Sequence, residues 1–137
     1  MIDEARLIEL AVQARKRAYC PYSNFPVGAA LLAKDGRIFT GCNVENASLG
    51  LTVCAERVAL LKAVSEGARE FVAIAIACGE GPCPPCGACR QVLYEFAPEL
   101  LLIMTDGEGK AVRRGTLSAL LPLAFGPSQP PGNRCAQ

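Results

Sequence analysis

The feature that most constrains the fold is an uninterrupted apolar run from Phe71 to Cys78, bounded by Gly67 and Gly79. A strand that is apolar at every position must be covered on both faces, as the central strands of layered α/β proteins are. The run is far shorter than the roughly 18 residues that a membrane span needs. We therefore expect this run to be the central strand of a covered sheet.

Helices are predicted on both sides of this strand. The first covers residues 2–18 and is amphipathic. The second, Thr52–Ser65, is apolar around nearly its whole circumference, which predicts burial on several sides. A third has Pro85 in its first turn and ends at Pro98. A short last helix is capped by Thr116.

Two further pairs of segments have the composition of strand hairpins. Val27–Ala33 and Ile38–Gly41 flank an Asp-Gly turn, and Leu100–Met104 and Ala111–Arg113 flank a longer polar turn. The resulting order of elements is αββαβαββα. This order implies an α/β fold, a mixed sheet with helices on its faces.

Length and charge narrow the class of protein. At 137 residues the chain has the size of one domain, which we place at residues 1–125, followed by a proline-rich and mobile tail at residues 126–137. The net charge of +1 offers no basic stripe for a nucleic acid. The first residues lack the basic and apolar regions of a signal peptide. We expect a cytoplasmic protein with no membrane partner.

Eight cysteines and no histidine restrict the metal chemistry that is open to this chain. Disulfides add little to a domain of this apolar content in a reducing compartment, so the cysteines are interpreted as thiols. A zinc site with three protein ligands must then use thiolates or include a carboxylate, and three cysteines are the economical choice. Cys20, Cys42 and Cys78 lack ligand spacing and are predicted to pack in the core, whereas Cys135 lies in the tail.

The predicted zinc ligands are Cys54, Cys86 and Cys89. Cys86 and Cys89 have Cys-x-x-Cys spacing, and all three lie near predicted helix N-termini, whose partial positive charge favours thiolates. Cys83 forms a competing pair with Cys86, but the two prolines between them have no N–H to donate to the sulfurs. Four bound cysteines would make a closed, structural zinc site, which is the non-enzymatic alternative. Each cysteine taken alone could also be a buried thiol.

Glu56 and Arg57 follow the first predicted ligand. Glu56 is two residues from Cys54, and such positions do not face each other on a helix, so we interpret it as a catalytic acid/base and not as a ligand. Arg57 is predicted to offset the negative charge of three thiolates on Zn²⁺. The alternatives are a glutamate that favours the helix dipole and an exposed helix charge.

At these residues the chain closely resembles the short, homo-oligomeric cytidine deaminases of pyrimidine salvage, whose zinc signature includes a non-ligand glutamate and a Pro-Cys-x-x-Cys element. The resemblance extends over all but the first few and the last dozen residues. It implies a three-layer α/β/α sandwich with a mixed five-stranded sheet, one Zn²⁺ per chain and a homotetramer. The segments that carry it are Tyr19–Ala30, Gly41–Ala47, Cys54–Arg57 and Pro85–Val92.

The resemblance also implies roles for residues outside the zinc signature. It implies that Asn43 and Glu45 hydrogen-bond the ribose, that Phe25 lines the pyrimidine pocket, and that the backbone of Ala55 contacts the base. Phe125 would reach a neighbouring subunit's pocket and stack on the pyrimidine. The alternatives are a turn residue at position 43, a solvated charge at 45, a core aromatic at 25 and an aromatic at 125 that pins the chain end.

The implied activity is hydrolytic deamination at C4 of cytidine or 2′-deoxycytidine, which gives uridine or 2′-deoxyuridine and ammonia. Zinc lowers the pKa of a water molecule, and Glu56 carries protons to N3 and to the leaving amine. A related aminopyrimidine nucleoside or a nucleoside antibiotic is the alternative substrate, and a structural zinc module in a binding protein is the alternative function. Leu49 stands where family members commonly carry a tyrosine, so no hydroxyl contact is expected there.

Overall fold

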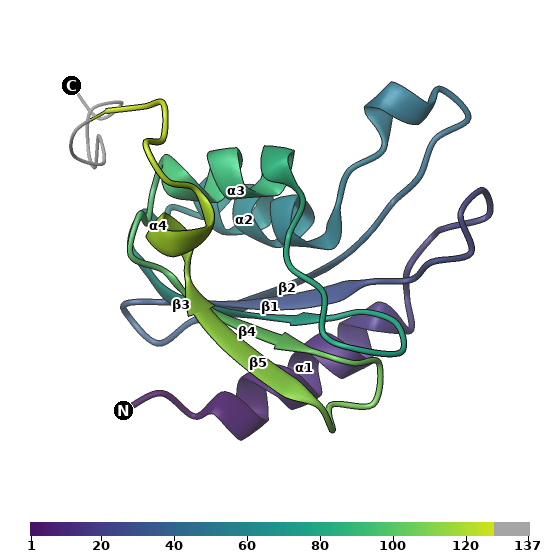
Figure 1. The fold of residues 1–137 in the computed structure, drawn as a ribbon, viewed down its shortest axis with the longest axis horizontal. Helices are drawn as coiled ribbons and strands as arrows, with labels where there is room; N and C mark the ends of the chain where they lie inside the picture. Colours follow the sequence, from purple (N-terminus) through teal and green to yellow (C-terminus); the bar gives the residue numbers. More distant parts are fainter. Residues whose placement is uncertain (128–137) are drawn as a thin grey trace.

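The computed structural model describes residues 1–127 as a five-stranded mixed sheet between two layers of helices (Figure 1). This architecture confirms the predicted three-layer α/β/α sandwich. Residues 128–137, most of the predicted tail, lie outside the described residues. The elements in chain order are α1 (Glu4–Arg15), β1 (Gly28–Ala33), β2 (Ile38–Cys42), the short 3-10 helix η1 (Leu49–Leu51), α2 (Ala55–Ser65), β3 (Phe71–Ala77), α3 (Gly87–Tyr94), β4 (Leu101–Thr105), β5 (Val112–Thr116) and α4 (Leu117–Leu120).

The apolar run forms β3, the middle strand of the sheet order β2-β1-β3-β4-β5. β3 pairs antiparallel with β1 on one side and parallel with β4 on the other. The parallel pair requires a crossover connection, which α3 supplies between the two strands. The five residues from Ala73 to Ala77 are almost completely buried, because strands cover both edges of β3 and helices cover both of its faces.

The two helical layers bury the two faces of the sheet separately. α1 covers one face, where Leu7 and Ala11 belong to a cluster with Ala75 and Ile103. α2, α3 and α4 lie on the opposite face (Figure 1). Their cluster is larger and includes Leu60. The helices near the predicted zinc ligands therefore belong to one layer.

The helix termini differ in detail from the prediction. α1 begins after Asp3, whose carboxylate accepts the Arg6 N–H at 3.1 Å, and its last helical residue is Arg15. Thr116 is the N-cap of α4 as predicted, although its hydroxyl makes no capping hydrogen bond. Within residues 1–127, none of the helices has the length and apolar character that a bilayer span requires.

α2 is less buried within one chain than its sequence predicts. It begins at Ala55, because Cys54 adopts an extended conformation and serves as the N-cap. Leu61 is 54% exposed, so one chain alone does not bury every side of this helix, and the predicted burial on several sides would require a neighbouring subunit. The helix lies at the surface of its layer and presents only one side to the sheet. α3 likewise begins at Gly87, so Pro85 precedes the helix and does not lie in its first turn.

Gly41 lets α2 approach the sheet closely. A Cβ atom at this position would lie 2.5 Å from the Ala55 carbonyl oxygen and 2.6 Å from the Ala59 nitrogen. No side chain fits at these distances, so the backbone of α2 rests directly on β2. Gly41 therefore sets the position of the N-terminus of α2, where Cys54 and Glu56 lie.

Candidate active site

Three sulfurs meet where the N-termini of α2 and α3 come together. Cys54 Sγ lies 3.8 Å from Cys86 Sγ, and Cys86 Sγ lies 3.5 Å from Cys89 Sγ. All three sulfurs lie within 4.8 Å of one another, and they form the one such cluster of metal-binding side chains found among residues 1–127. Zn–S bonds of about 2.3 Å in a tetrahedron place the sulfurs about 3.8 Å apart. The observed spacing fits this ion.

The electrostatics of the cluster also favour a cation. Cys54 and Cys86 are the N-caps of their helices, where the helix dipole stabilises negative charge. Hydrogen bonds from the Cys89 thiol and from Arg57 lower the pKa of Cys54 to about 5. The pKa of Cys89 is raised, because its thiol is hydrogen-bonded to the Cys54 sulfur and is buried. Adjacent thiols of this kind ionise together only when a cation compensates their charge.

Arg57 makes direct contact with the cluster. Its Nη2 donates to Cys54 Sγ at 3.4 Å, and this bond raises the pKa of the guanidinium. Its Nε is buried and has no hydrogen-bond partner among the described residues. The positive charge therefore lies beside the sulfurs and not on the outer surface of α2.

Glu56 is a buried carboxyl group, with only 4% of its surface exposed. Burial is the main cause that raises its pKa to about 7, and the charge of Cys54 acts in the same direction. A carboxyl group with this pKa can take up and release a proton near neutral pH. The alternative of a solvent-exposed first-turn glutamate does not describe this residue.

A cavity of about 280 Å³ adjoins the sulfurs and Glu56. Its wall brings together Cys54 and Cys86 with four of the five residues that the resemblance connects to substrate: Phe25, Asn43, Glu45 and Ala55. Cys89 is buried beside the other two sulfurs. The wall also contains residues to which the sequence interpretation gave no role: Ser23, Val27, Thr52, Ile76, Cys83 and Pro84. Ser23 and Val27 lie in a segment that carries the resemblance, and Cys83 and Pro84 lie in the competing Cys-x-x-Cys pair. Thr52 and Ile76 had no functional signal in the sequence.

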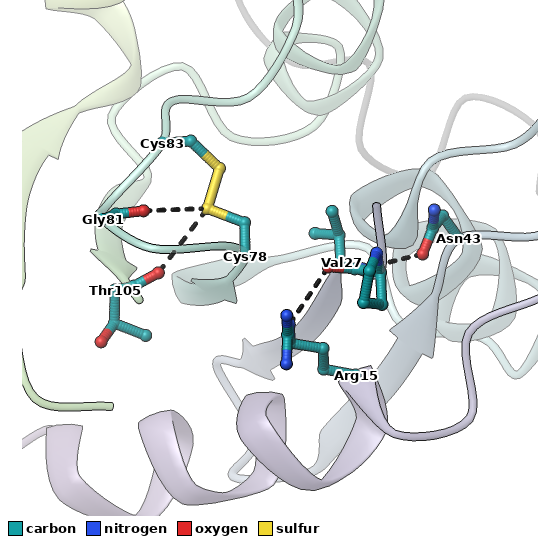
Figure 2. The surroundings of a disulfide bond; sticks show 8 residues. Arg15, Val27, Asn43, Cys78, Gly81, Cys83 and Thr105 are labelled. Carbon is teal, nitrogen blue, oxygen red and sulfur yellow. Dashed lines mark hydrogen bonds between the residues drawn. A yellow bond between two sulfur atoms is a disulfide. The ribbon is translucent and has the colours of Figure 1, made fainter. Parts of the chain in front are cut away.

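The side chain of Asn43 holds the segment that carries Phe25. Its Oδ1 accepts the Val27 N–H at 2.8 Å, and its Nδ2 donates to the Phe25 carbonyl at 3.0 Å (Figure 2 shows the contact with Val27). Arg15 braces the same segment through a 3.1 Å hydrogen bond from Nε to the Pro26 carbonyl. One amide hydrogen of Asn43 remains available for a ligand.

Cys78 and Cys83 form a disulfide, which corrects the interpretation of both as thiols (Figure 2). Their Cα atoms lie 6.5 Å apart at a sequence separation of 5. The usual redox compartment does not predict this bond, because a short glycine-containing turn brings these two sulfurs together. Cys83 is therefore engaged outside the three-sulfur cluster. Of the other cysteines, Cys20 and Cys42 are half-buried free thiols, and Cys135 lies beyond the described residues.

Two residues singled out by the sequence do not reach the cavity of their own chain. Phe125 is 87% exposed, and its carbonyl oxygen accepts a hydrogen bond from Gln91 Nε2 at 2.8 Å. Leu49 lies in η1 and is 69% exposed. Both side chains face away from the core of this chain.

Known proteins share this fold and about half of the residues of this sequence. Residues 1–105 match the profile of the cytidine and deoxycytidylate deaminase zinc-binding region. A cytidine deaminase from Halalkalibacterium halodurans is 53% identical over 125 residues, which cover 90% of this chain and 95% of that protein. One from Mycobacterium tuberculosis is 48% identical over 125 residues, which cover 90% of each. The crystal structure of a cytidine deaminase from Burkholderia pseudomallei has a TM-score of 0.85 and 53% identity, and the match covers 91% of this chain and 100% of that one.

Proposed function

Because the chain belongs to the family of zinc-binding cytidine and deoxycytidylate deaminases, we propose that its cavity binds cytidine and hydrolyses the 4-amino group, which yields uridine and ammonia. 2′-Deoxycytidine would react in the same way. The observation that carries the proposal is the buried Glu56 carboxyl group, which shares one cavity wall with two of the three clustered sulfurs.

Cys54, Cys86 and Cys89 would hold the metal, with one Zn²⁺ per chain. When bound, zinc acts as a Lewis acid that lowers the pKa of a water molecule enough for attack at neutral pH. Three thiolates exceed the charge of Zn²⁺ by about one unit. The guanidinium of Arg57, which donates to Cys54, offsets this excess.

Glu56 is the proton carrier in this proposal. It accepts a proton from water as the water oxygen attacks C4, and it delivers this proton to N3. It then takes the proton of the new C4 hydroxyl group and delivers it to the amine, which leaves as ammonia while the C4 carbonyl forms. Both directions of transfer need a carboxyl group whose pKa is close to the working pH. Burial gives Glu56 a pKa of about 7, which meets this requirement.

The remaining residues of the cavity wall orient the nucleoside. We propose that Phe25 contacts the pyrimidine, that the Ala55 backbone contacts the polar edge of the base, and that Asn43 and Glu45 bind the sugar. Their shared cavity wall supports these roles.

The charges of the cavity wall bear on the choice between a nucleoside and a nucleotide substrate. The wall contains two carboxylates and neither lysine nor arginine, so it offers no cation that could bind a phosphate group. This composition favours a nucleoside over deoxycytidylate as the substrate.

We further propose a homotetramer in which Phe125 completes the cavity of a neighbouring subunit. The support is the exposure of Phe125 outside its own cavity, together with a set of exposed apolar side chains: Leu49, Leu51, Leu61 and Leu123. We also propose that residues 1–125 of each subunit form a single deaminase domain. The cytoplasmic location stays a prediction from the sequence.

Cytidine turnover by the purified, zinc-loaded protein tests the proposal. Loss of the ultraviolet absorbance of cytidine should be matched by equal amounts of uridine and ammonia. Deoxycytidylate at the same concentration should react far more slowly, because of the acidic cavity wall. A protein that holds zinc and leaves cytidine unchanged would contradict the proposed reaction, and turnover of a different aminopyrimidine nucleoside would correct the substrate.

A further inference from the structure

The hydroxyl of Ser23 links two walls of the cavity. It donates to the carboxylate of Glu45 through a short hydrogen bond to Oε2, and it accepts the backbone N–H of Phe25 at 3.0 Å. All three residues line the same cavity. A serine hydroxyl has one hydrogen to donate, so its donor is committed to Glu45 while one of its lone pairs is used by Phe25.

Glu45 is also held by the backbone of the same turn. Its Oε1 accepts the N–H groups of Tyr22 at 3.0 Å and of Ser23 at 3.1 Å. The Ser23 hydroxyl is the largest of the causes that lower the pKa of Glu45 and keep it ionised. The hydroxyl thus holds the second carboxylate oxygen, and together with the two backbone N–H groups it sets the orientation of the carboxylate.

We propose that Ser23 is a positioning residue that determines specificity for the sugar, because its hydroxyl holds the Glu45 carboxylate at a fixed place relative to Phe25. The inference rests on the proposed function, in which Glu45 binds the sugar and Phe25 contacts the base. Ser23 acts through Glu45 and need not touch the substrate. Its contribution should therefore appear only with substrates that carry the hydroxyl groups to which Glu45 binds.

The test compares cytidine with 2′,3′-dideoxycytidine, which has the same base but lacks both ring hydroxyls of the sugar. Ser23→Ala should raise the KM for cytidine about five- to tenfold, the scale of one lost hydrogen bond of ordinary net strength, and should change kcat less than about twofold. The kcat/KM for the dideoxy substrate should stay within about twofold. The preference for cytidine over its dideoxy analogue should therefore fall by about the same five- to tenfold.

Two variants control for the hydroxyl and for general damage. Ser23→Thr keeps a hydroxyl and should restore most of the preference. Ser118→Ala removes a comparable exposed hydrogen bond, from the Ser118 hydroxyl to the Glu99 carboxylate at 3.1 Å. Neither residue lines the cavity, so this variant should leave the kcat/KM for both substrates unchanged. Melting temperatures of all variants show whether the fold is intact.

Glu45→Gln separates this inference from the proposed function. If Glu45→Gln lowers the sugar preference and Ser23→Ala does not, the role of Ser23 is wrong and the cavity assignment stands. If neither variant changes the preference, the proposed sugar contact of Glu45 is wrong and the inference falls with it. Equal losses with both substrates in Ser23→Ala would show general damage and would also overturn the inference. In the double variant, the loss of preference should equal that of Glu45→Gln alone, because Ser23 acts through Glu45.

Discussion

Cys78, at the end of the apolar run, is bonded to Cys83, which lies three residues before Cys86 (Figure 2). The disulfide closes the turn between β3 and α3 and engages the sulfur that would otherwise compete for the metal. Cys78 Sγ lies 3.5 Å from the Gly81 carbonyl oxygen and 3.7 Å from the Thr105 carbonyl oxygen. If the disulfide were reduced, the Cys78 thiol could donate a hydrogen bond to either oxygen. Neither sulfur of this pair belongs to the cluster of Cys54, Cys86 and Cys89.

Zinc content should divide the cysteines into two groups. Cys54→Ser, Cys86→Ser and Cys89→Ser each remove one of three clustered sulfurs and should lose most of the zinc, whereas Cys83→Ser should keep about one zinc per chain. Metal analysis of the purified variants measures this. Loss of zinc from Cys83→Ser would instead indicate that Cys83 is a ligand and that the site is a closed, structural one.

Arg57→Gln should slow turnover more than it weakens the fold. The change removes the donor to Cys54 and the positive charge beside the sulfurs. A water molecule activated there should become a weaker acid, so the pH–rate profile should shift to higher pH and kcat near neutral pH should fall roughly tenfold. Arg37→Gln is the control, because Arg37 pairs with Asp35 in the first hairpin, outside the cavity wall. An unchanged profile in Arg57→Gln would mean that this charge does not act on the reaction.

Gly41→Ala tests how the sheet positions the site. The added methyl group would overlap the backbone of α2, which should cost about 1–3 kcal/mol of stability, as overpacking usually does. The resulting shift of α2 should also weaken zinc binding, because Cys54 is its N-cap. Gly50→Ala is the matched control, since a Cβ there meets no atom within 4 Å. Equal melting temperatures and zinc affinities for the two variants would contradict this account of Gly41.

Phe125→Ala should lower kcat/KM without loss of zinc. Stacking of an aromatic ring on a base is worth about 1–3 kcal/mol, so the expected loss is roughly five- to 150-fold. Steady-state kinetics with cytidine measures the loss, and metal analysis confirms that the cluster is intact. A loss of kcat/KM below twofold would contradict stacking of Phe125 on the base.

A mixing experiment distinguishes a shared cavity from a local effect of Phe125. Subunits of Phe125→Ala are reassembled with subunits of zinc-loaded, inactive Glu56→Gln. If the cavity combines residues of two chains, some mixed cavities contain an intact Glu56 and an intact Phe125, and activity should exceed the sum of the separate preparations. No gain in verified mixed oligomers, or a monomeric protein at assay concentration, would contradict the shared cavity.

Local sequence patterns predicted the order of elements because the periodicity of apolar residues differs between helices and strands, and glycine or proline lies in most of the connections between them. The same patterns missed the exact helix starts. Cys54 and Cys86 are N-caps, and a cap is defined by the backbone conformation, which hydrophobic periodicity does not encode. The apolar composition of α2 predicts burial but does not say whether the same chain or another chain covers Leu61, which is exposed in the single chain.

The candidate site was predictable where its chemistry depends on spacing along the chain. Cys86 and Cys89 have ligand spacing, and Cys54 and Glu56 lie together near a predicted helix N-terminus, so the residues themselves suggested the site and the resemblance supported it. The disulfide of Cys78 depends on the path of a turn, and the hydrogen bond from Ser23 to Glu45 joins residues that are 22 positions apart. Such contacts are set by the folded backbone, and no pattern within a single segment indicates them.

The most direct test of the account is the turnover of cytidine by zinc-loaded Glu56→Gln at saturating substrate. Glutamine keeps the shape of the buried side chain but cannot carry a proton, so kcat should fall by about 10² or more, the usual scale of general acid/base catalysis. Zinc should remain at about one per chain. Glu66→Gln, an exposed change at the end of the same helix, should leave kcat unchanged. Near-normal turnover by Glu56→Gln would contradict the central claim that Glu56 carries the protons of the reaction.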